Sequence, residues 1–514
     1  MSALSKSILV AIFICLLALY GSAPLFLPAP EAASAPAYQF SAERAMSHLN
    51  TLAAIKRVAG SPGMEETANY LIAVLSGISL EPEVQESVTS TGRLRNVVVR
   101  IPGRDSDQAL LILTHLDSIS YGAGDNASGV AVLLEVARSL LADVQPKHDI
   151  ILLFDDGEEQ GYRGGYAFAG SHRWMSKVRS VIGLDTAAWG PVILLQTTPG
   201  NEKWISAYSR SVQNPTAFGF FANSDWNISK DTSEIQPFFE QGLPGMALED
   251  PTAFQGKHSN LDTVEHIRPG SLQQMGEQTL SLARFISDTD VGLASTRDHS
   301  YFTLWKIGVW HYPASWNIAW MILSVVGMVA ILVRGLRQRI YSIGTLLLAG
   351  LSYLLIYVGI ALLGVVFGKW FESLYPNTNP YIESYLNAAS LPFFLMVILV
   401  VVVVYFIVRT KIVHSLGNII VMQTGLLFWV LFALISTVFL QAGSYVFTIP
   451  LIGFILAGFL PFRLKFLKIV PTAFSIILIT PNIVLAFLGT GFQTLALVTI
   501  LIALNMELWI SAIP

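Results

Sequence analysis

Long apolar segments fill the C-terminal part of this 514-residue chain. Each is long enough to cross the hydrocarbon core of a bilayer as a helix. Only 13% of the residues are charged, and most of these lie between Tyr38 and Asp298. We therefore expect a soluble domain followed by a membrane domain of about seven transmembrane helices. The seven apolar segments are residues 316–333, 340–367, 386–408, 417–440, 444–460, 469–487 and 490–512.

A further apolar segment follows Lys6 near the N-terminus and is long enough to span a membrane. A cleaved signal peptide is the alternative, with a small-residue site at Ala33–Ala35. Pro36 follows that site directly and disfavours cleavage. We therefore expect residues 1–37 to hold a cytoplasmic N-terminus and an uncleaved signal-anchor helix.

Three basic clusters test this membrane topology, because clusters of Lys and Arg favour the cytoplasmic side of a membrane. With eight spans and a cytoplasmic N-terminus, Arg334–Arg339, Arg409–Lys411 and Arg463–Lys468 all lie on that side. The soluble domain and the loop Lys369–Tyr385 then lie outside the cytoplasm. We expect a multi-pass integral membrane protein whose soluble domain faces a bacterial periplasm or cell exterior, or an organelle lumen in a eukaryote.

The composition also excludes some partners and sites. The net charge is -4, and no basic stripe is interleaved with aromatic residues, so nucleic acid is not an expected partner. The single cysteine, Cys15, lies in the first apolar segment, which excludes disulfides and thiolate metal sites within the chain. Any metal must be held by His, Asp and Glu. The single cysteine and the short membrane half favour a bacterial source.

The soluble part, residues 38–292, alternates short apolar runs with segments of helical spacing. Nearly continuous apolar runs suit strands of a sheet that is covered on both faces. We therefore expect an α/β sandwich as the fold class of the soluble part. A linker at residues 293–315 should join it to the membrane domain at residues 316–514. The expected strands are Asn96–Ile101, Ala109–His115, Asp149–Phe154, Ser180–Asp185 and Gly245–Asp250.

Carboxylates and imidazoles follow these strands at the positions where each strand ends. Taken singly, such residues are more often hydrogen-bonded scaffolding, solvated acids or helix caps. Five of them after successive strands of one sheet can converge, because chemistry in open sheets collects outside the strand ends. Five imidazole and carboxylate ligands suit a two-metal hydrolytic centre, and without thiolates they suit Zn²⁺. The five are His115, Asp125, Glu159, Asp185 and His258.

The order and spacing of these motifs resemble zinc metallopeptidase family twenty-eight, which contains the di-zinc aminopeptidases. The resemblance covers Ala42–Ser287 and includes "THLDS", "GDNASGVA", "DGEE", "GLD" and "KHSNLDT". An N-terminal anchor and a polytopic C-terminal region resemble the membrane-bound branch with endoplasmic-reticulum metallopeptidases and vacuolar membrane proteases. The resemblance implies a three-layer α/β/α sandwich with a mixed, mostly parallel sheet.

The resemblance implies that two zinc ions are held by five residues of this chain. Asp125 would bridge the two ions. His115 and Asp185 would complete one site, and Glu159 and His258 would complete the other. These residue roles come from the family pattern, carried over position by position.

The resemblance also implies roles for two further acids. Glu158 would be the general base, which takes a proton from the attacking water and delivers it to the leaving amine. Asp117 would contact the metal ligands rather than the metal and would fix their orientation. The peptide bond between Asp125 and Asn126 is expected to be cis. Asp155 and Asp156 are given no catalytic role and are expected to form hydrogen bonds in the loop after their strand.

The chain departs from the family pattern beside two expected ligands. Many relatives have Tyr-His-Thr where this chain has Lys257, His258 and Ser259. Membrane-linked relatives often carry an arginine shortly after the carboxylate at Asp185, and "DTAAW" has none. Substrate contacts are therefore less well defined by the sequence than the metal ligands are.

We expect a zinc-dependent exopeptidase that acts on peptides, with an aminopeptidase favoured over a carboxypeptidase or dipeptidase. A receptor or assembly subunit that keeps the fold without catalysis stays open, as does a homo-oligomer. The membrane helices are expected to act as an anchor, an oligomerisation surface or a platform for substrate. Glu507 is interpreted as an interfacial acid near the cytoplasmic end of the last span.

Overall fold

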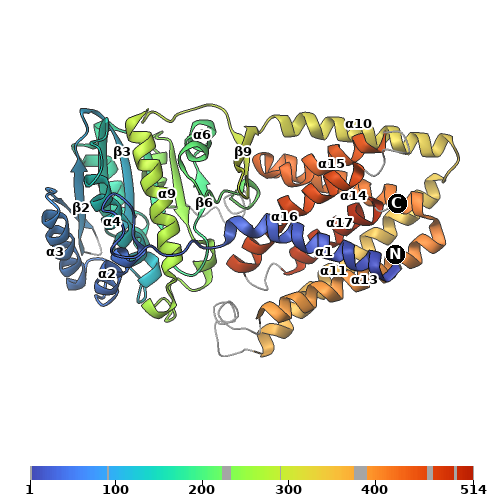
Figure 1. The fold of residues 1–514 in the computed structure, drawn as a ribbon, viewed down its shortest axis with the longest axis horizontal. Coiled ribbons are helices and arrows are strands. Elements are labelled where there is room, and N and C mark those ends of the chain that lie inside the picture. Colours follow the sequence, from blue (N-terminus) through green and yellow to red (C-terminus); the bar gives the residue numbers. More distant parts are fainter. Residues whose placement is uncertain are drawn as a thin grey trace. The chain divides into compact units, whose positions relative to one another are not determined.

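The computed structural model describes residues 3–89, 92–222, 233–289, 291–374, 390–459, 467–490 and 495–512. The chain divides into two compact units, coloured along the sequence in Figure 1. We call them the α/β unit and the helical unit. The α/β unit is formed by Pro24–Phe218 and Ile228–Pro313, and the helical unit by Met1–Ala23, Gly219–Asn227 and Ala314–Pro514.

A seven-stranded mixed sheet forms the centre of the α/β unit, in the order β1-β2-β4-β3-β5-β7-β6. β3, β4, β5 and β7 are parallel to one another. The β1–β2, β2–β4 and β6–β7 pairs are antiparallel. The strands are β1 (Glu83–Thr89), β2 (Gly92–Ile101), β3 (Asp105–His115), β4 (His148–Asp155), β5 (Val178–Asp185), β6 (Ile193–Thr197) and β7 (Gly245–Glu249).

Helices pack on this sheet and give the α/β sandwich that the sequence predicts, so the fold class is confirmed (Figure 1). α4 and α9 pack against β3 and β4. A buried apolar cluster joins residues of α5 and α8 to β2, β3, β4 and β5. The helices are α2 (Ala42–Ala53), α3 (Pro62–Gly77), α4 (Gly129–Leu141), α5 (Arg163–Ser171), α6 (Glu202–Ser211), α8 (Gln236–Phe239) and α9 (Pro269–Asp288).

The parallel strands bring their carboxyl ends to one edge of the sheet. The register pairs His115 with Asp155 of β4, and Asp185 with Glu249 of β7. β4 and β7 are buried along their whole length, which matches their continuous apolar sequence. Polar side chains at the ends of these strands therefore gather at one edge, at the rim of an apolar core.

Residues 293–315, expected to be a linker, contain an antiparallel hairpin of β8 (His299–Leu304) and β9 (Gly308–Pro313). β8 is buried throughout, and Phe302 forms an isolated antiparallel bridge with Phe218. The α/β unit therefore extends to Pro313. Burial of β8 against other parts of the unit explains the difference, since a solvated linker would leave these side chains exposed.

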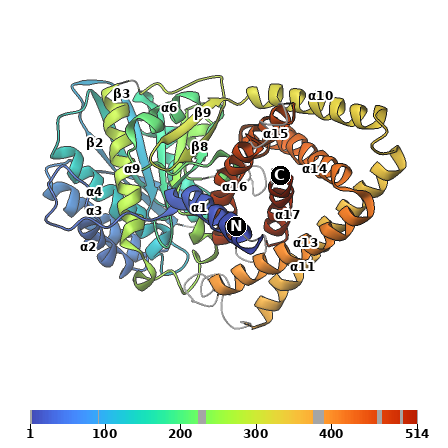
Figure 2. The same cartoon turned by 45° about the vertical axis from the view of Figure 1, so that its right-hand side comes forward.

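The helical unit contains one helix for each apolar segment that the sequence indicates. Five of the described helices, α10, α11, α13, α14 and α16, are long and apolar enough to cross a membrane, and the apolar stretches described in α1, α15 and α17 are shorter. Figure 2 shows α14, α15, α16 and α17, which pack on one another. The helices are α1 (Ala3–Ser22), α10 (Trp316–Arg337), α11 (Ile343–Leu374), α13 (Ser390–Leu416), α14 (Asn418–Phe439), α15 (Tyr445–Gly458), α16 (Ile469–Thr490) and α17 (Leu495–Ala512).

The structure bears differently on two of the basic clusters that the sequence predicts on the cytoplasmic side. α13 continues through Arg409–Lys411. Most of Arg463–Lys468 lies outside the described residues, as does most of the loop Lys369–Tyr385. The side of the membrane on which each segment lies stays a prediction.

Glu507, expected from the sequence to be an interfacial acid, is fully buried among helices, and its depth in a membrane stays a prediction. Its carboxylate accepts hydrogen bonds from Arg409 Nε at 2.8 Å and Nη2 at 3.0 Å. The hydroxyl groups of Tyr353 and Tyr405 each donate to Glu507 Oε2 at 2.6 Å. A charge between membrane helices is expensive unless it is paired, and this pair joins α11, α13 and α17. Such a partner on another helix cannot be identified from sequence spacing.

We predict that Glu507→Leu destabilises the helical unit, because it leaves Arg409 buried without its partner. Removing one member of a buried pair costs about 3–5 kcal/mol, whereas an apolar replacement of both is often neutral. Thermal unfolding of the full chain in detergent should show a lower midpoint for Glu507→Leu and recovery in the Arg409→Leu/Glu507→Leu double variant. Lys411→Leu, at an exposed position of α13, is the control. A Glu507→Leu variant as stable as the unmodified chain would contradict this assignment.

Candidate metal centre

The expected metal ligands come from four parallel strands and the turns that follow them. His115 ends β3 and Asp185 ends β5. Glu159 lies in the short turn Glu158–Gln160 after β4, and Asp125 lies in the turn Ala123–Ser128 before α4. His258 follows β7 and has a positive φ of 67°. The structure brings all five into two groups that share Asp125.

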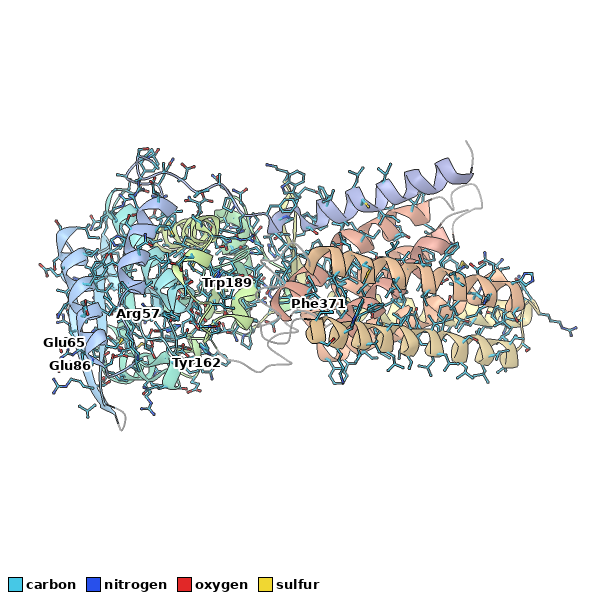
Figure 3. The ribbon with its side chains drawn as sticks, turned by 90° about the horizontal axis from the view of Figure 1, so that it is seen from below. Arg57, Glu65, Glu86, Tyr162, Trp189 and Phe371 are labelled. Carbon is cyan, nitrogen blue, oxygen red and sulfur yellow. The ribbon has the colours of Figure 1, made fainter. Side chains whose placement is uncertain are left out.

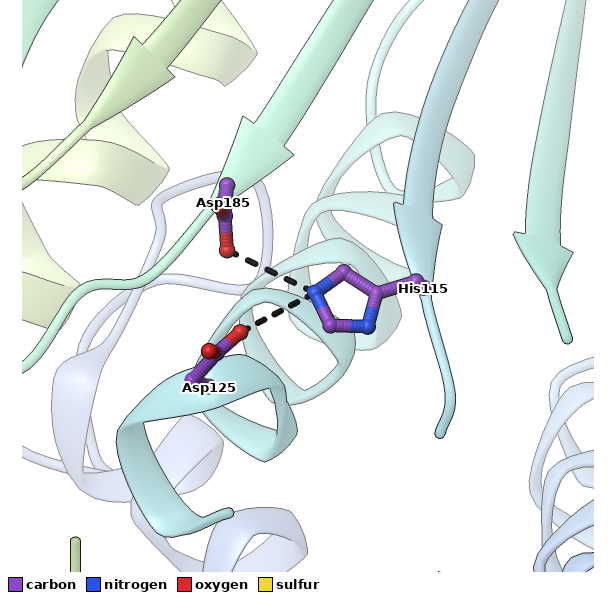
Figure 4. A group of neighbouring side chains, drawn as sticks. All are labelled: His115, Asp125 and Asp185. Carbon is purple, nitrogen blue, oxygen red and sulfur yellow. Dashed lines mark ion pairs between the residues drawn. The ribbon is translucent and has the colours of Figure 1, made fainter. Parts of the chain in front are cut away.

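The first group contains His115, Asp125 and Asp185 (Figure 4). His115 Nε2 lies 3.1 Å from Asp125 Oδ1 and 3.5 Å from Asp185 Oδ1. All three residues are buried. The ligand atoms lie within 4.8 Å of one another, so they can hold one metal ion.

The second group contains Asp125, Glu159 and His258. His258 Nε2 lies 3.0 Å from Asp125 Oδ2 and 3.0 Å from Glu159 Oε1. Asp125 therefore presents Oδ1 to the first group and Oδ2 to the second. Such an arrangement of one carboxylate is what a bridge between two metal ions requires.

Buried neighbours fix the position of Asp125. The peptide bond between Asp125 and Asn126 is cis, which confirms the prediction for this bond. The carboxylate of Asp262 accepts hydrogen bonds from the backbone N–H groups of Gly124 at 2.5 Å and Asp125 at 3.1 Å. Asn126 Nδ2 donates to the Leu184 carbonyl oxygen at 2.9 Å, which ties this turn to β5.

Asp262 and Arg57 are supporting residues that the sequence analysis missed. Arg57, labelled in Figure 3, is fully buried, and its guanidinium donates to the carbonyl oxygens of Leu116 at 3.0 Å and Gly122 at 2.5 Å. Both carbonyls belong to the segment between β3 and the turn that carries Asp125. Asp262 stands in the "KHSNLDT" motif and could have been singled out there, whereas the sequence gives no signal for Arg57.

Asp117 supports the other side of the site through backbone groups. Its Oδ1 accepts from the N–H of Glu158 at 3.0 Å, and its Oδ2 accepts from the N–H of Glu159 at 3.2 Å. The Asp117 carbonyl oxygen lies 3.1 Å from His115 Nδ1. A partner at Nδ1 orients the ring so that Nε2 faces the first group. Asp117 thus positions three residues of the site.

Glu158 lies beside the first group, with Oε2 at 3.9 Å from His115 Nε2. Burial raises the pKa of its carboxyl to about 8, and the negative charges of Asp185, Asp125 and Glu159 add to the effect. His115 lies close enough to oppose this shift. The carboxyl therefore has a strong tendency to accept a proton, which is the property required of a general base near neutral pH.

The two imidazoles also show that negative charge dominates the centre. Hydrogen bonding to Asp125 and Glu159 raises the pKa of His258 to about 10. Burial alone would lower the pKa of His115, but Glu158 and neighbouring carboxylates raise it well above its usual value. A metal ligand must be a neutral imidazole, so a bound cation would take the place of these protons.

Two buried oxygen atoms indicate that the residues fit a metal ion. Asp125 Oδ2 and Glu159 Oε1 both face His258 Nε2 at 3.0 Å, and neither accepts a hydrogen bond from any other described group. Buried carboxylate oxygens are costly unless they are hydrogen-bonded or coordinate a metal. Imidazole nitrogen and carboxylate oxygen are donors that Zn²⁺ accepts, so the donor set fits zinc.

Lys257 and Glu249 complete this edge of the sheet, and the sequence analysis gave neither a role. Lys257 Nζ lies 3.1 Å from Asp185 Oδ2 and 3.2 Å from Glu249 Oε1. Burial alone would lower the pKa of Lys257, but Asp185 and Glu249 hold it well above its usual value. A charged ammonium group therefore adjoins the first metal group.

Asp155 and Asp156 precede the two glutamates, where loop hydrogen bonds are expected from the sequence. Both are buried rather than in a solvated loop, and burial raises the pKa of each carboxyl to about 7. Asp156 Oδ2 accepts from the N–H of Arg95 at 3.0 Å, which links the end of β4 to β2. These acids have a structural position and belong to neither metal group.

Part of the chain that includes this site is similar to known proteins. Residues 96–283 match the family model for peptidase family M28. The mouse protein endoplasmic reticulum metallopeptidase 1 is 28% identical over 300 residues, a match that covers 51% of this chain and 32% of that protein. The vacuolar membrane protease of Candida dubliniensis is 27% identical over 311 residues, covering 59% of this chain and 32% of that protein. The chain thus spans about a third of the length of these relatives.

Solved structures also align with part of this chain. A zinc aminopeptidase from Bacillus subtilis aligns with a TM-score of 0.39 and 16% identity, covering 48% of this chain and 94% of that one. A glutaminyl cyclase from Porphyromonas gingivalis aligns with a TM-score of 0.40 and 19% identity, covering 48% and 98%. Residues 96–283 are thus similar to peptidase family M28, and the chain carries described helices that are long and apolar enough to cross a membrane.

Proposed function

We propose that this chain is a membrane-anchored di-zinc exopeptidase that releases N-terminal residues from peptides outside the cytoplasm. The observation that carries the proposal is the position of Asp125, whose two oxygens face two separate imidazoles at 3.1 Å and 3.0 Å. One carboxylate shared in this way suits two ions held side by side. Hydrolytic centres that act through two metals have this arrangement.

Five residues would hold the zinc ions. His115 and Asp185 would complete the ion on one side of Asp125, and Glu159 and His258 the ion on the other. When bound, zinc supplies Lewis-acid chemistry, which polarises a carbonyl group and lowers the pKa of water. Asp117 would keep the ligands in place by binding the backbone of the Glu158–Glu159 turn.

Glu158 would act as the general base and then as the general acid. It stands outside both metal groups, and its carboxyl lies at the rim of the first one. The raised pKa favours acceptance of a proton from the attacking water. The same carboxyl would return that proton to the amine that leaves when the peptide bond breaks.

Two alternatives remain for the same site. A carboxypeptidase or dipeptidase would use the same ligands and differ in how it holds the end of the peptide. A receptor or assembly subunit would keep the fold without hydrolysis. Intact ligands and a positioned Glu158 support an enzyme, and the match to named proteases supports a peptidase.

We predict that Glu158→Gln lowers kcat by about 10²–10⁴-fold, because an amide cannot carry the proton. The variant should keep the metal content of the unmodified chain, because Glu158 is not in either metal group. Purified full-length protein should be tested on a panel of amino-acid and peptide amides, with bound metal measured in parallel. Glu65→Gln, at an exposed position labelled in Figure 3, is the matched control.

The panel also separates the alternatives. Cleavage of peptides with a free N-terminus but not of N-blocked peptides supports the aminopeptidase. Release of C-terminal residues would support the carboxypeptidase instead. A metal content near two ions per chain, with no peptide cleaved, would support the receptor or assembly subunit. Unchanged activity in Glu158→Gln would contradict the role given to this residue.

We predict that metal removal destabilises the α/β unit, because it leaves several buried carboxylates at one edge of the sheet without their cation. Ligand present at 100–1,000 times its Kd stabilises the bound form by about 3–4 kcal/mol. A chelator should therefore lower the unfolding midpoint by several degrees, on the order of 10 °C, and zinc should restore it. Asp125→Asn should weaken the binding of both ions, whereas His258→Ala should weaken the binding of only one. A midpoint that is insensitive to chelator would contradict a metal-stabilised site.

A further inference from the structure

Three neighbouring parallel strands place side chains in a row at the edge of the sheet. These are His115 of β3, Asp185 of β5 and Glu249 of β7. The register pairs Asp185 with Glu249 directly, so their carboxylates lie side by side at the carboxyl ends of the strands. Both residues are buried, at 8% and 4% exposure. Two adjacent buried carboxylates repel each other unless a cation lies between them.

Lys257 supplies that cation. Its Nζ bridges Asp185 Oδ2 at 3.1 Å and Glu249 Oε1 at 3.2 Å. The other oxygen, Asp185 Oδ1, faces His115 Nε2 at 3.5 Å and accepts from the Thr186 hydroxyl group at 2.9 Å. Asp185 is therefore divided between a candidate metal ion on one side and a fixed ammonium group on the other.

The second metal group has a different electrostatic environment. The described ion pairs of Glu159 are with the imidazole of His258, and no lysine or arginine stands among them. Lys257 contacts Asp185, which belongs only to the first group, while its charge also acts on Asp125, which the two groups share. A positive charge beside one ion of a pair disfavours that ion, because like charges repel across a poorly screened distance.

We propose that Lys257 is a positioning residue that weakens metal binding at the His115–Asp125–Asp185 group relative to the Asp125–Glu159–His258 group, and that Glu249 limits this effect. The inference rests on the proposed two-metal function. It makes the first group the one that fills last and releases its ion first. Lys257 also selects the oxygen that Asp185 turns toward the metal, because it occupies Oδ2.

The proposal predicts opposite effects from two substitutions. Lys257→Met removes the repelling charge and leaves Glu249 unneutralised, so affinity at the first group should rise by about tenfold or more. Glu249→Gln removes a negative charge that offsets the charge of Lys257, so zinc affinity at the first group should fall. Lys257→Arg keeps the charge and should stay close to the unmodified affinity. Damage to the fold would lower affinity in every variant and cannot produce the rise.

The measurement is zinc titration calorimetry of the full chain in detergent, in a His258→Ala background where only the first group is complete. In a His115→Ala background, where only the second group is complete, Lys257→Met should have a smaller effect. Lys56→Met, at an exposed position, is the matched control. Unmodified protein should bind two ions with unequal affinity.

The outcomes separate this inference from the proposed function. If the unmodified chain binds no zinc or a single ion, the two-metal proposal fails and the inference fails with it. If two ions bind but Lys257→Met leaves the first group unchanged or weaker, the inference alone is overturned. A rise with Lys257→Met together with a fall for Glu249→Gln supports it.

Discussion

Excess negative charge at one edge of the sheet is the constraint on which the rest of the site depends. Parallel strands deliver acids from separate parts of the sequence to the same edge, where burial removes the water that would screen them. Such an arrangement is stable only if positive charge is also present. Lys257 supplies part of it, and the two groups around Asp125 suit metal ions.

The surrounding scaffold holds these acids through backbone groups more than through side chains. Asp262 binds the N–H groups before the Asp125–Asn126 bond, and Asp117 binds those of the Glu158–Glu159 turn. A carboxylate that accepts two backbone N–H groups fixes a turn in place without occupying the metal position. The ligands are thus set by rigid turns at the ends of buried strands, which is what a metal site needs for fixed geometry.

The glutamate pair shows how much of the site the sequence could predict. Glu158 and Glu159 are neighbours in sequence, and the family pattern by itself gives them different roles. In the folded chain Glu159 joins a metal group, while Glu158 stands beside the other group. The roles themselves stay proposals. For Asp155 and Asp156 the sequence predicts hydrogen bonds in a loop; Asp156 accepts one from the N–H of Arg95, but both acids are buried at the end of β4.

The residues that sequence analysis missed share a physical reason. Glu249 and Lys257 become important only because β5 and β7 are neighbours in register. Glu507 became a buried ion-pair partner only because Arg409 lies on another helix, far away in the chain. Periodicity reports which face of an element is apolar, but it does not report which other element covers that face. The sequence by itself determined the class of the two units, the order of strands and helices, and the motifs that resemble those of peptidase family M28. The tertiary structure decided which carboxylates share a cation, that Asp125 faces two imidazoles, and that Lys257 takes one oxygen of Asp185. These depend on strand order and register, because distances of a few ångströms between residues far apart in the chain are fixed only by folding.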